Sequence, residues 1–301
     1  MKLPIPVLVV SLAFLASCDK AFESASVEGP SVAAVNYPLA YFAERLTGDF
    51  ATIIFDCPED EDPAFWKPTD ADIARMQSAD VILLNGATYA KWAATASLPK
   101  SKTVDTSIAF KDQWIFVEEA ITHSHGDDEE EHSHGGTAFT TWIDFEQAIL
   151  QATAVKGALT RAFPDQKDTI ETNFAALQTD LEDVDNLMAD AAKGLQDAPV
   201  IASHPIYQYF ARAYEVEVIE LVWEPEMDVD EKAIADLKAA MEAHPGAKYF
   251  MWEGEPLAES VEALEGLGLT SFVFTQCPNR PESGDFLSVM KENIEAMKSL
   301  P

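Results

Sequence analysis

The stretch ADVILLNG, residues 79–86, decides the class of fold. Its apolar run predicts a short buried strand, Val81–Asn85, which Gly86 ends. Three similar runs in the first half of the chain predict strands at Val32–Asn36, Ala51–Asp56 and Lys102–Asp105. Between them we expect helices at about 37–46 and 69–79, and a short one at 89–94. Because strands and helices alternate, we expect a parallel sheet with helices on both faces.

The second half of the chain repeats this plan. It predicts strands at Val200–Ser203, Val216–Val222, Lys248–Trp252 and Ser271–Thr275, and helices at about 206–214, 230–243, 256–266 and 285–299. Two long helical stretches, 144–163 and 166–195, separate the halves. We therefore expect an α/β protein of two lobes, each a four-stranded parallel sheet flanked by helices, joined by a long backbone helix. The expected parts are an N-terminal lobe at 31–164, the linking helix at 165–196 and a C-terminal lobe at 197–301.

The N-terminus predicts a lipid-anchored, extracytoplasmic protein. Residues 1–18 read MKLPIPVLVVSLAFLASC, in which the apolar run is too short to span a membrane comfortably and is typical of a secretory signal. Its last four residues resemble a bacterial lipobox, in which Cys18 is lipidated; an ordinary cleaved signal is the alternative. Asp19 resembles the inner-membrane retention signal of Gram-negative lipoproteins. We therefore expect the periplasmic face of the inner membrane, with residues 19–30 as a polar tether.

Composition restricts the classes of function. The formal net charge is −32, so the surface repels nucleic acid and anionic lipid and attracts cations, although solubility or salt adaptation would explain the charge equally well. The sequence has no phosphate-cradling glycine pattern, no nucleophile elbow and no His-Glu-x-x-His helix. We therefore do not expect an enzyme.

A histidine-rich segment, HSHGDDEEEHSHG, begins at residue 123. It holds four of the six histidines of the chain, at His123, His125, His132 and His134. Neutral imidazole binds Zn²⁺, Cu²⁺ and Ni²⁺, and the segment has almost no apolar side chains to bury, so we expect a surface loop that collects divalent metal. The alternative is a solvated polar loop.

Unusual side chains follow the predicted strands. In open parallel sheets, ligands bind outside the carboxyl ends of the strands, so a cleft between the lobes is the expected binding site. The residues at these ends are Asn36, Asp56, Cys57 and Asn85 in the first half, and His204, Glu224, Glu253, Glu255, Cys277 and Asn279 in the second.

Over nearly the whole mature length, the chain resembles the metal-binding lipoproteins of zinc and manganese ABC importers. The matching pieces are Asp62-Pro63 followed by PTDADI at 68–73, ADVILLNG at 79–86, the histidine-rich loop before Trp142, the long linking helix, Ser203-His204 and Glu255-Pro256. The resemblance implies two rigid lobes with small motions, a metal site in the cleft, and delivery to a membrane permease and its ATPase.

The chain departs from this family at its metal ligands. The family has histidines after Asp-Pro and two residues before the tryptophan, where this sequence has Ala64 and Thr140. Its acidic ligand falls where Thr275 and Gln276 stand, and only its third histidine, His204, is present. One imidazole does not make a tetrahedral zinc site, so the usual site cannot form.

Three explanations remain open. The cleft uses substitute ligands, for which Cys57, His204, Cys277 and Glu255 are the candidates, and thiolates there would favour Zn²⁺ or Cu⁺. Alternatively, Cys57 and Cys277 form a disulfide across the cleft, or the cleft holds no metal and the histidine loop is either the working site or a relic. His204 is equally consistent with a helix-capping or core histidine.

We expect an extracytoplasmic solute-binding lipoprotein of a metal ABC importer, most simply for Zn²⁺, with Mn²⁺ or Cu⁺ as other candidates. The expected partners are the permease, its ATPase and the membrane, and the protein is expected to be a monomer. One alternative is a metal-buffering or metallochaperone lipoprotein acting through the histidine loop. Another is a receptor or adhesion module of the same fold with a non-metal ligand.

Overall fold

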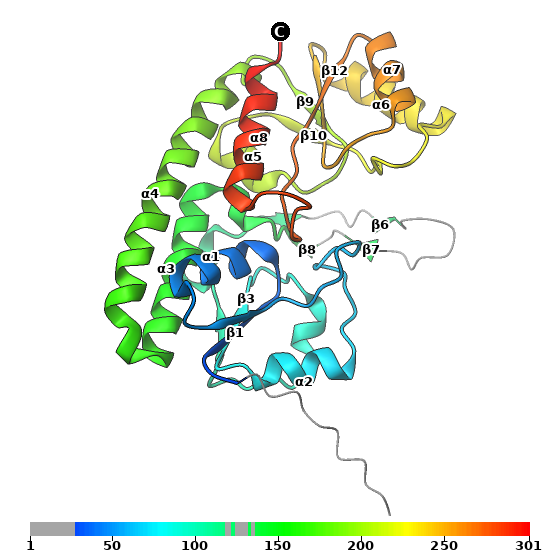
Figure 1. Ribbon diagram of the computed structural model, residues 1–301. Helices are drawn as coiled ribbons and strands as arrows, with labels where there is room; N and C mark the ends of the chain where they lie inside the picture. Colours follow the sequence, from blue (N-terminus) through cyan, green and yellow to red (C-terminus); the bar gives the residue numbers. More distant parts are fainter. Residues whose placement is uncertain (1–27, 118–121, 124–131, 134–135) are drawn as a thin grey trace, which may run out of the picture.

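The computed structural model describes residues 28–117, 122–123, 132–133 and 136–301. The expected signal sequence, Cys18 and most of the expected tether lie outside this range. Two four-stranded parallel sheets form the two lobes (Figure 1). The first sheet has the order β2-β1-β3-β4, with β1 at Ser31–Ala34, β2 at Thr52–Ile54, β3 at Val81–Leu84 and β4 at Thr103–Asp105. The second has the order β10-β9-β11-β12, with β9 at Val200–Ala202, β10 at Val218–Glu220, β11 at Tyr249–Trp252 and β12 at Thr270–Val273.

Helices flank both sheets, as the alternating pattern predicts. The N-terminal lobe has α1 (Tyr37–Thr47), α2 (Asp70–Ser78) and α3 (Phe145–Ala162), and the C-terminal lobe has α5 (Gln208–Ala213), α6 (Glu231–Ala243), α7 (Ala258–Gly266) and α8 (Phe286–Lys298). Asn36 caps α1 by accepting from the Leu39 N–H, and Thr69 and Asp72 form a capping box at α2. The predicted α/β class and the repeated plan are therefore confirmed.

The long helix α4 (Lys167–Ala192) has 26 residues and runs along one side of both lobes (Figure 1). It packs against α1, α3 and α8. One hydrophobic core therefore extends through both lobes, whereas a smaller second core around Trp223 and Trp252 lies inside the C-terminal lobe. Among the described residues, no helix is both long and apolar enough to cross a bilayer.

The short helix expected at 89–94 begins two residues later than predicted. The structure has a 3₁₀ helix only at Lys91–Ala94. Ala87, Thr88 and Ala90 have φ values of 48°, 63° and 50°, in the left-handed region, where a right-handed helix cannot begin. The apolar composition of this stretch gives no sign of that backbone conformation.

Short strands surround the histidine-rich segment. Strand β5 (Phe116–Val117) pairs with β8 (Gly136–Thr137), and β6 (Thr122–His123) pairs antiparallel with β7 (His132–Ser133). His123 and His132 are cross-strand partners in this register. His125 and His134 lie outside the described residues.

Candidate metal centre

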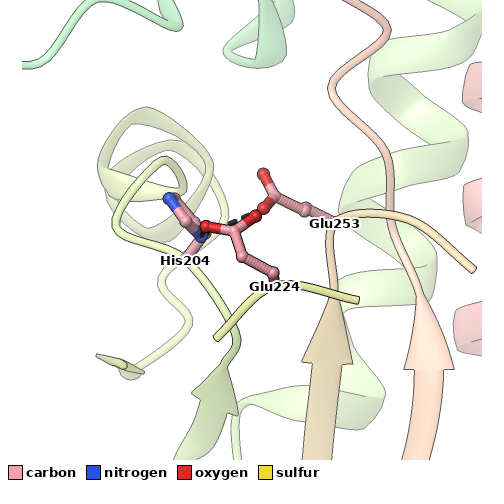
Figure 2. A group of neighbouring side chains, drawn as sticks. All are labelled: His204, Glu224 and Glu253. Atoms are coloured by element: carbon pink, nitrogen blue, oxygen red, sulfur yellow. Dashed lines mark ion pairs between the residues drawn. The ribbon is translucent and has the colours of Figure 1, made fainter. Parts of the chain in front are cut away.

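Three side chains of the C-terminal lobe converge at the carboxyl ends of neighbouring strands. His204 follows β9, Glu224 follows β10 and Glu253 follows β11. Because these strands are parallel and adjacent, their ends meet at one edge of the sheet. Each residue offers a ligand atom, and these atoms all lie within 4.8 Å of one another (Figure 2). Among the described residues this is the one such group of three or more histidine, cysteine or acidic side chains.

The group is compact and largely shielded from water. His204 Nδ1 lies 3.0 Å from Glu253 Oε1 and 3.9 Å from Glu224 Oε1. The exposed fractions of the side chains are 3% for His204, 13% for Glu224 and 18% for Glu253. Two carboxylates are thus held against one buried imidazole, an arrangement that needs a positive charge between them.

The backbone around Ser203 sets the relative positions of these three residues. The Ser203 N–H donates to Met251 O, the Trp223 N–H donates to Ser203 O, and the Glu253 N–H donates to Ser203 Oγ. The first two bonds measure 2.8 Å and the third 3.1 Å. Ser203 is fully buried, so it joins the ends of three strands at the position just before His204.

The charges around His204 decide its protonation. Burial lowers the pKa of His204, but Glu253, through its charge and a hydrogen bond, and then Glu224 raise it to a net value of about 9. The imidazole is therefore protonated near pH 7 in the absence of metal. A cation that binds His204 has to displace this proton.

A cavity of about 30 Å³ lies beside the group, between the two lobes. That volume holds one water molecule or one ion. Its C-terminal wall includes His204, Glu253 and Gln276. Its N-terminal wall consists of Asp62, Phe65, Tyr89, Phe139, Thr140 and Trp142. The carboxyl ends of both sheets thus enclose the cavity, as expected for an open parallel fold.

Of the positions that depart from the family pattern, Thr140 and Gln276 form hydrogen bonds across the lobes, whereas Ala64 offers no ligand atom. Thr140 lines the cavity, and its hydroxyl donates to Ile206 O across the lobes. Ala64 is buried and has no side-chain donor atom. Gln276 lines the cavity, and its backbone oxygen accepts from Trp142 Nε1 at 2.7 Å.

The other three candidate ligands lie outside the group of His204, Glu224 and Glu253. Cys57 and Cys277 are free, buried thiols rather than a disulfide. Burial is the main reason that the pKa of each thiol is raised to about 12, so both are protonated at neutral pH. Glu255 is exposed, two residues beyond Glu253. Of the four candidates, the structure brings only His204 into the group.

Sequence reasoning placed Glu224 and Glu253 at strand ends without selecting them. Their shared position after β10 and β11, the two strands that flank β9, is the signal that singles them out. The strand order that makes it visible becomes known only with the structure.

Comparisons with known proteins agree with this architecture. The family model for the periplasmic component A of the zinc-uptake complex (ZnuA) matches residues 32–300. The high-affinity zinc uptake system protein ZnuA of Bacillus subtilis is 23% identical over 319 residues, which cover 96% of this chain and 95% of that protein. The zinc-binding lipoprotein AdcA of Streptococcus pneumoniae is 23% identical over 273 residues, 87% of this chain; this chain spans only about half (54%) of AdcA.

Solved structures share the fold. The metal-dependent lipoprotein YcdH of Bacillus subtilis superposes with a TM-score of 0.75 at 20% identity, covering 89% of this chain and 98% of that one. The Zn(II)-bound ZnuA-like domain of Streptococcus pneumoniae AdcA gives 0.73 at 19% identity, covering 90% and 98%. These relatives are metal-binding and metal-uptake proteins rather than enzymes. With the family model matching almost the whole described length, the chain belongs to the family of periplasmic zinc-uptake components.

Proposed function

We propose that this protein is an extracytoplasmic solute-binding lipoprotein of a zinc ABC importer, and that it captures Zn²⁺ between its lobes at His204, Glu224 and Glu253. The observation that carries this proposal is the convergence of the buried His204 with the half-buried Glu224 and Glu253 beside a cavity of single-ion size. The named relatives that bind or take up zinc support the choice of metal.

The chemistry of the donors is consistent with zinc. Imidazole nitrogen and carboxylate oxygen both bind Zn²⁺ at about 2.0–2.2 Å, so ligand atoms in a tetrahedral site lie roughly 3.4 Å apart. The present atoms lie within 4.8 Å of one another, and small side-chain rotations would bring them to that spacing. The group contains no thiolate, which favours zinc or manganese over Cu⁺.

The remaining parts of the proposal concern location and partners. Cys18 would carry the lipid anchor, and residues 19–30 would connect it to the two lobes at the periplasmic face of the inner membrane. A permease and its ATPase would take over the captured ion from a monomeric binding protein. The uptake systems to which the relatives belong support this assignment.

A second candidate function is metal buffering through the histidine-rich segment, with His123, His125, His132 and His134 as ligands. The pairing of β6 with β7 favours it, because it places His123 opposite His132. This function is compatible with the first, since a segment that collects zinc would supply the cavity site.

Zinc titration of the full chain and two histidine variants tests the cavity site. His204→Ala should abolish the tightest zinc site, because it removes the one imidazole of the group. His244→Ala is the matched control: His244 caps α6 and lies 3.2 Å from Glu217, outside the group. Equal tight binding by both variants would contradict the proposal. Replacing the four histidines of the segment by asparagine should remove only weaker sites; if it removed the tightest one, buffering would be the main function.

A further inference from the structure

All three side chains of the candidate centre belong to the C-terminal lobe. A cation bound by them alone would leave the N-terminal lobe without a part in binding. Yet N-terminal residues form the other wall of the same cavity. Of the described N-terminal residues that line it, Asp62 is the one that carries a carboxylate. It is exposed, and so stands at the solvent side of the cavity.

A hydrogen-bonded loop holds Asp62 in place. The loop lies between β2 and α2, and Asp62 Oδ1 accepts from the Ala64 N–H at 2.8 Å. Asn279, which follows β12 in the other lobe, donates from Nδ2 to Pro58 O at 2.6 Å and to Glu61 O at 2.9 Å. One side chain of the C-terminal lobe thus fixes the backbone directly before Asp62.

The residues next to Asn279 reinforce this contact. Pro278 O accepts from the Tyr37 N–H at 2.8 Å. The Arg280 guanidinium lies 2.7 Å from Glu44 and 4.9 Å from the centre of the Tyr37 ring. Residues 278–280 therefore connect the end of β12 to α1 and to the loop that carries Asp62. These contacts hold the two cavity walls in a fixed relative position.

We propose that Asp62 is the N-terminal-lobe ligand of the captured cation and that Asn279 is its positioning residue. The inference rests on the proposed function. Three donors leave one position of a tetrahedral zinc ion open, and the Asp62 carboxylate, which lies outside the 4.8 Å group, would turn from the opposite wall to fill it. Asp62 stands two residues before Ala64, where the family pattern has a histidine. The chain has then moved its N-terminal ligand along the loop rather than lost it.

Two substitutions in this loop separate ligation from charge. Asp62→Asn keeps an oxygen for the Ala64 N–H but loses the carboxylate. Asp60→Asn makes the same charge change in the same loop, at an exposed residue that does not line the cavity. Both are made in the full chain with the four histidines of the loop replaced by asparagine, and zinc affinity is measured by competition with a chromophoric chelator. We expect a loss of about tenfold or more for Asp62→Asn and less than about twofold for Asp60→Asn.

A double-mutant cycle tests the positioning role. Asn279→Ala should weaken zinc binding by several-fold in the parent but have no further effect when combined with Asp62→Asn, because both changes act through one ligand. A merely structural contact would instead give additive losses. Asn186→Ala is the control, since its amide bonds a backbone carbonyl, Glu182 O, on the exposed side of α4.

The reactivity of Cys57 gives an independent readout. Its sulfur lies 3.8 Å from Asn279 Nδ2 and is covered by the same loop. Asn279→Ala should therefore speed alkylation of Cys57, followed in the Cys57 peptide by mass spectrometry, while Asn186→Ala should not.

The possible outcomes distinguish the two proposals. If the parent binds one zinc ion tightly and Asp62→Asn behaves like Asp60→Asn, the role of Asp62 is refuted and the site of His204, Glu224 and Glu253 stands. Additive losses or an unchanged Cys57 rate would refute the positioning role of Asn279. If the parent binds no zinc, the proposed function itself fails.

Discussion

His204 is the residue on which the candidate centre depends. In the metal-free protein its imidazolium balances Glu224 and Glu253, and with metal bound the same ring would donate a lone pair. Proton and cation thus compete for one buried space between two carboxylates.

This competition predicts a pH dependence of zinc binding. Because the pKa of His204 is raised from 6.5 to about 9, apparent zinc affinity should fall about tenfold for each pH unit below about pH 9. The stability of the metal-free protein should change in the opposite sense: the contribution of His204 is fully present below about pH 6.5 and is lost as pH rises through about pH 9. Zinc titrations and urea unfolding between about pH 6 and pH 9 check both trends. A flat affinity profile would mean that His204 does not bind the ion.

At the residue scale, the sequence allowed part of the site to be predicted. His204 is identified by its position before a proline at a strand end. Choosing between Glu253 and Glu255 requires the direction of each side chain, and only Glu253 turns towards the imidazole. Cys57 and Cys277 also follow predicted strands, yet they lie outside the group. A position after a strand places a residue at one edge of the sheet but does not say which residues at that edge lie close together.

At the scale of the elements, the hydrogen bonds of Ser203 connect the end of β9 to the segments that follow β10 and β11. Ser203→Ala would leave the part-buried Glu253 N–H without its acceptor, which costs about 1–3 kcal/mol. We expect that loss in the free energy of urea unfolding, together with weaker zinc binding, because Glu253 would no longer be held in place.

Ser260→Ala is the comparison for that prediction. Ser260 is equally buried, on α7, but its hydroxyl has no hydrogen-bond partner among the described residues. Its removal should leave zinc affinity and unfolding nearly unchanged. Similar losses for both variants would argue against the role assigned to Ser203.

The elements themselves could largely be predicted, because hydrophobic period and capping residues act locally. The alternation of short apolar runs with helices gives both sheets, and Thr69 and Asp72 mark the start of α2. The short helix expected at 89–94 begins only at Lys91, since the left-handed backbone at Ala90 and the residues before it leaves no pattern in the sequence.

For the whole molecule, the shared core is the main determinant of behaviour. Phe286, at the start of α8, is fully buried and contacts Phe42 of α1 at 5.8 Å and Phe145 of α3 at 6.2 Å between ring centres. A residue of the C-terminal segment is thus packed among helices of the N-terminal lobe. The way the lobes dock, and with it the placement of Asp62 and His204 on the walls of one cavity, depends on such contacts and could not be predicted from local patterns.

Phe286→Ala should lower the free energy of unfolding by about 3–5 kcal/mol, and the protein should still unfold in a single transition. Leu187→Ala, on the exposed side of α4, should cost much less. Urea unfolding, followed by both fluorescence and circular dichroism, measures the free energy of unfolding and the number of transitions. Separate transitions for the two lobes would show that the core does not couple them.

The continuous core has a further consequence for the proposed delivery of the ion to a permease. A receptor whose lobes share one core differs little in outline between its loaded and empty forms. Under the proposed function, a permease would then distinguish the two forms only through local differences at the mouth of the cavity, such as the charge of Asp62. Loaded and empty receptors should therefore compete for the same docking surface, and uptake should slow when the empty form is in large excess.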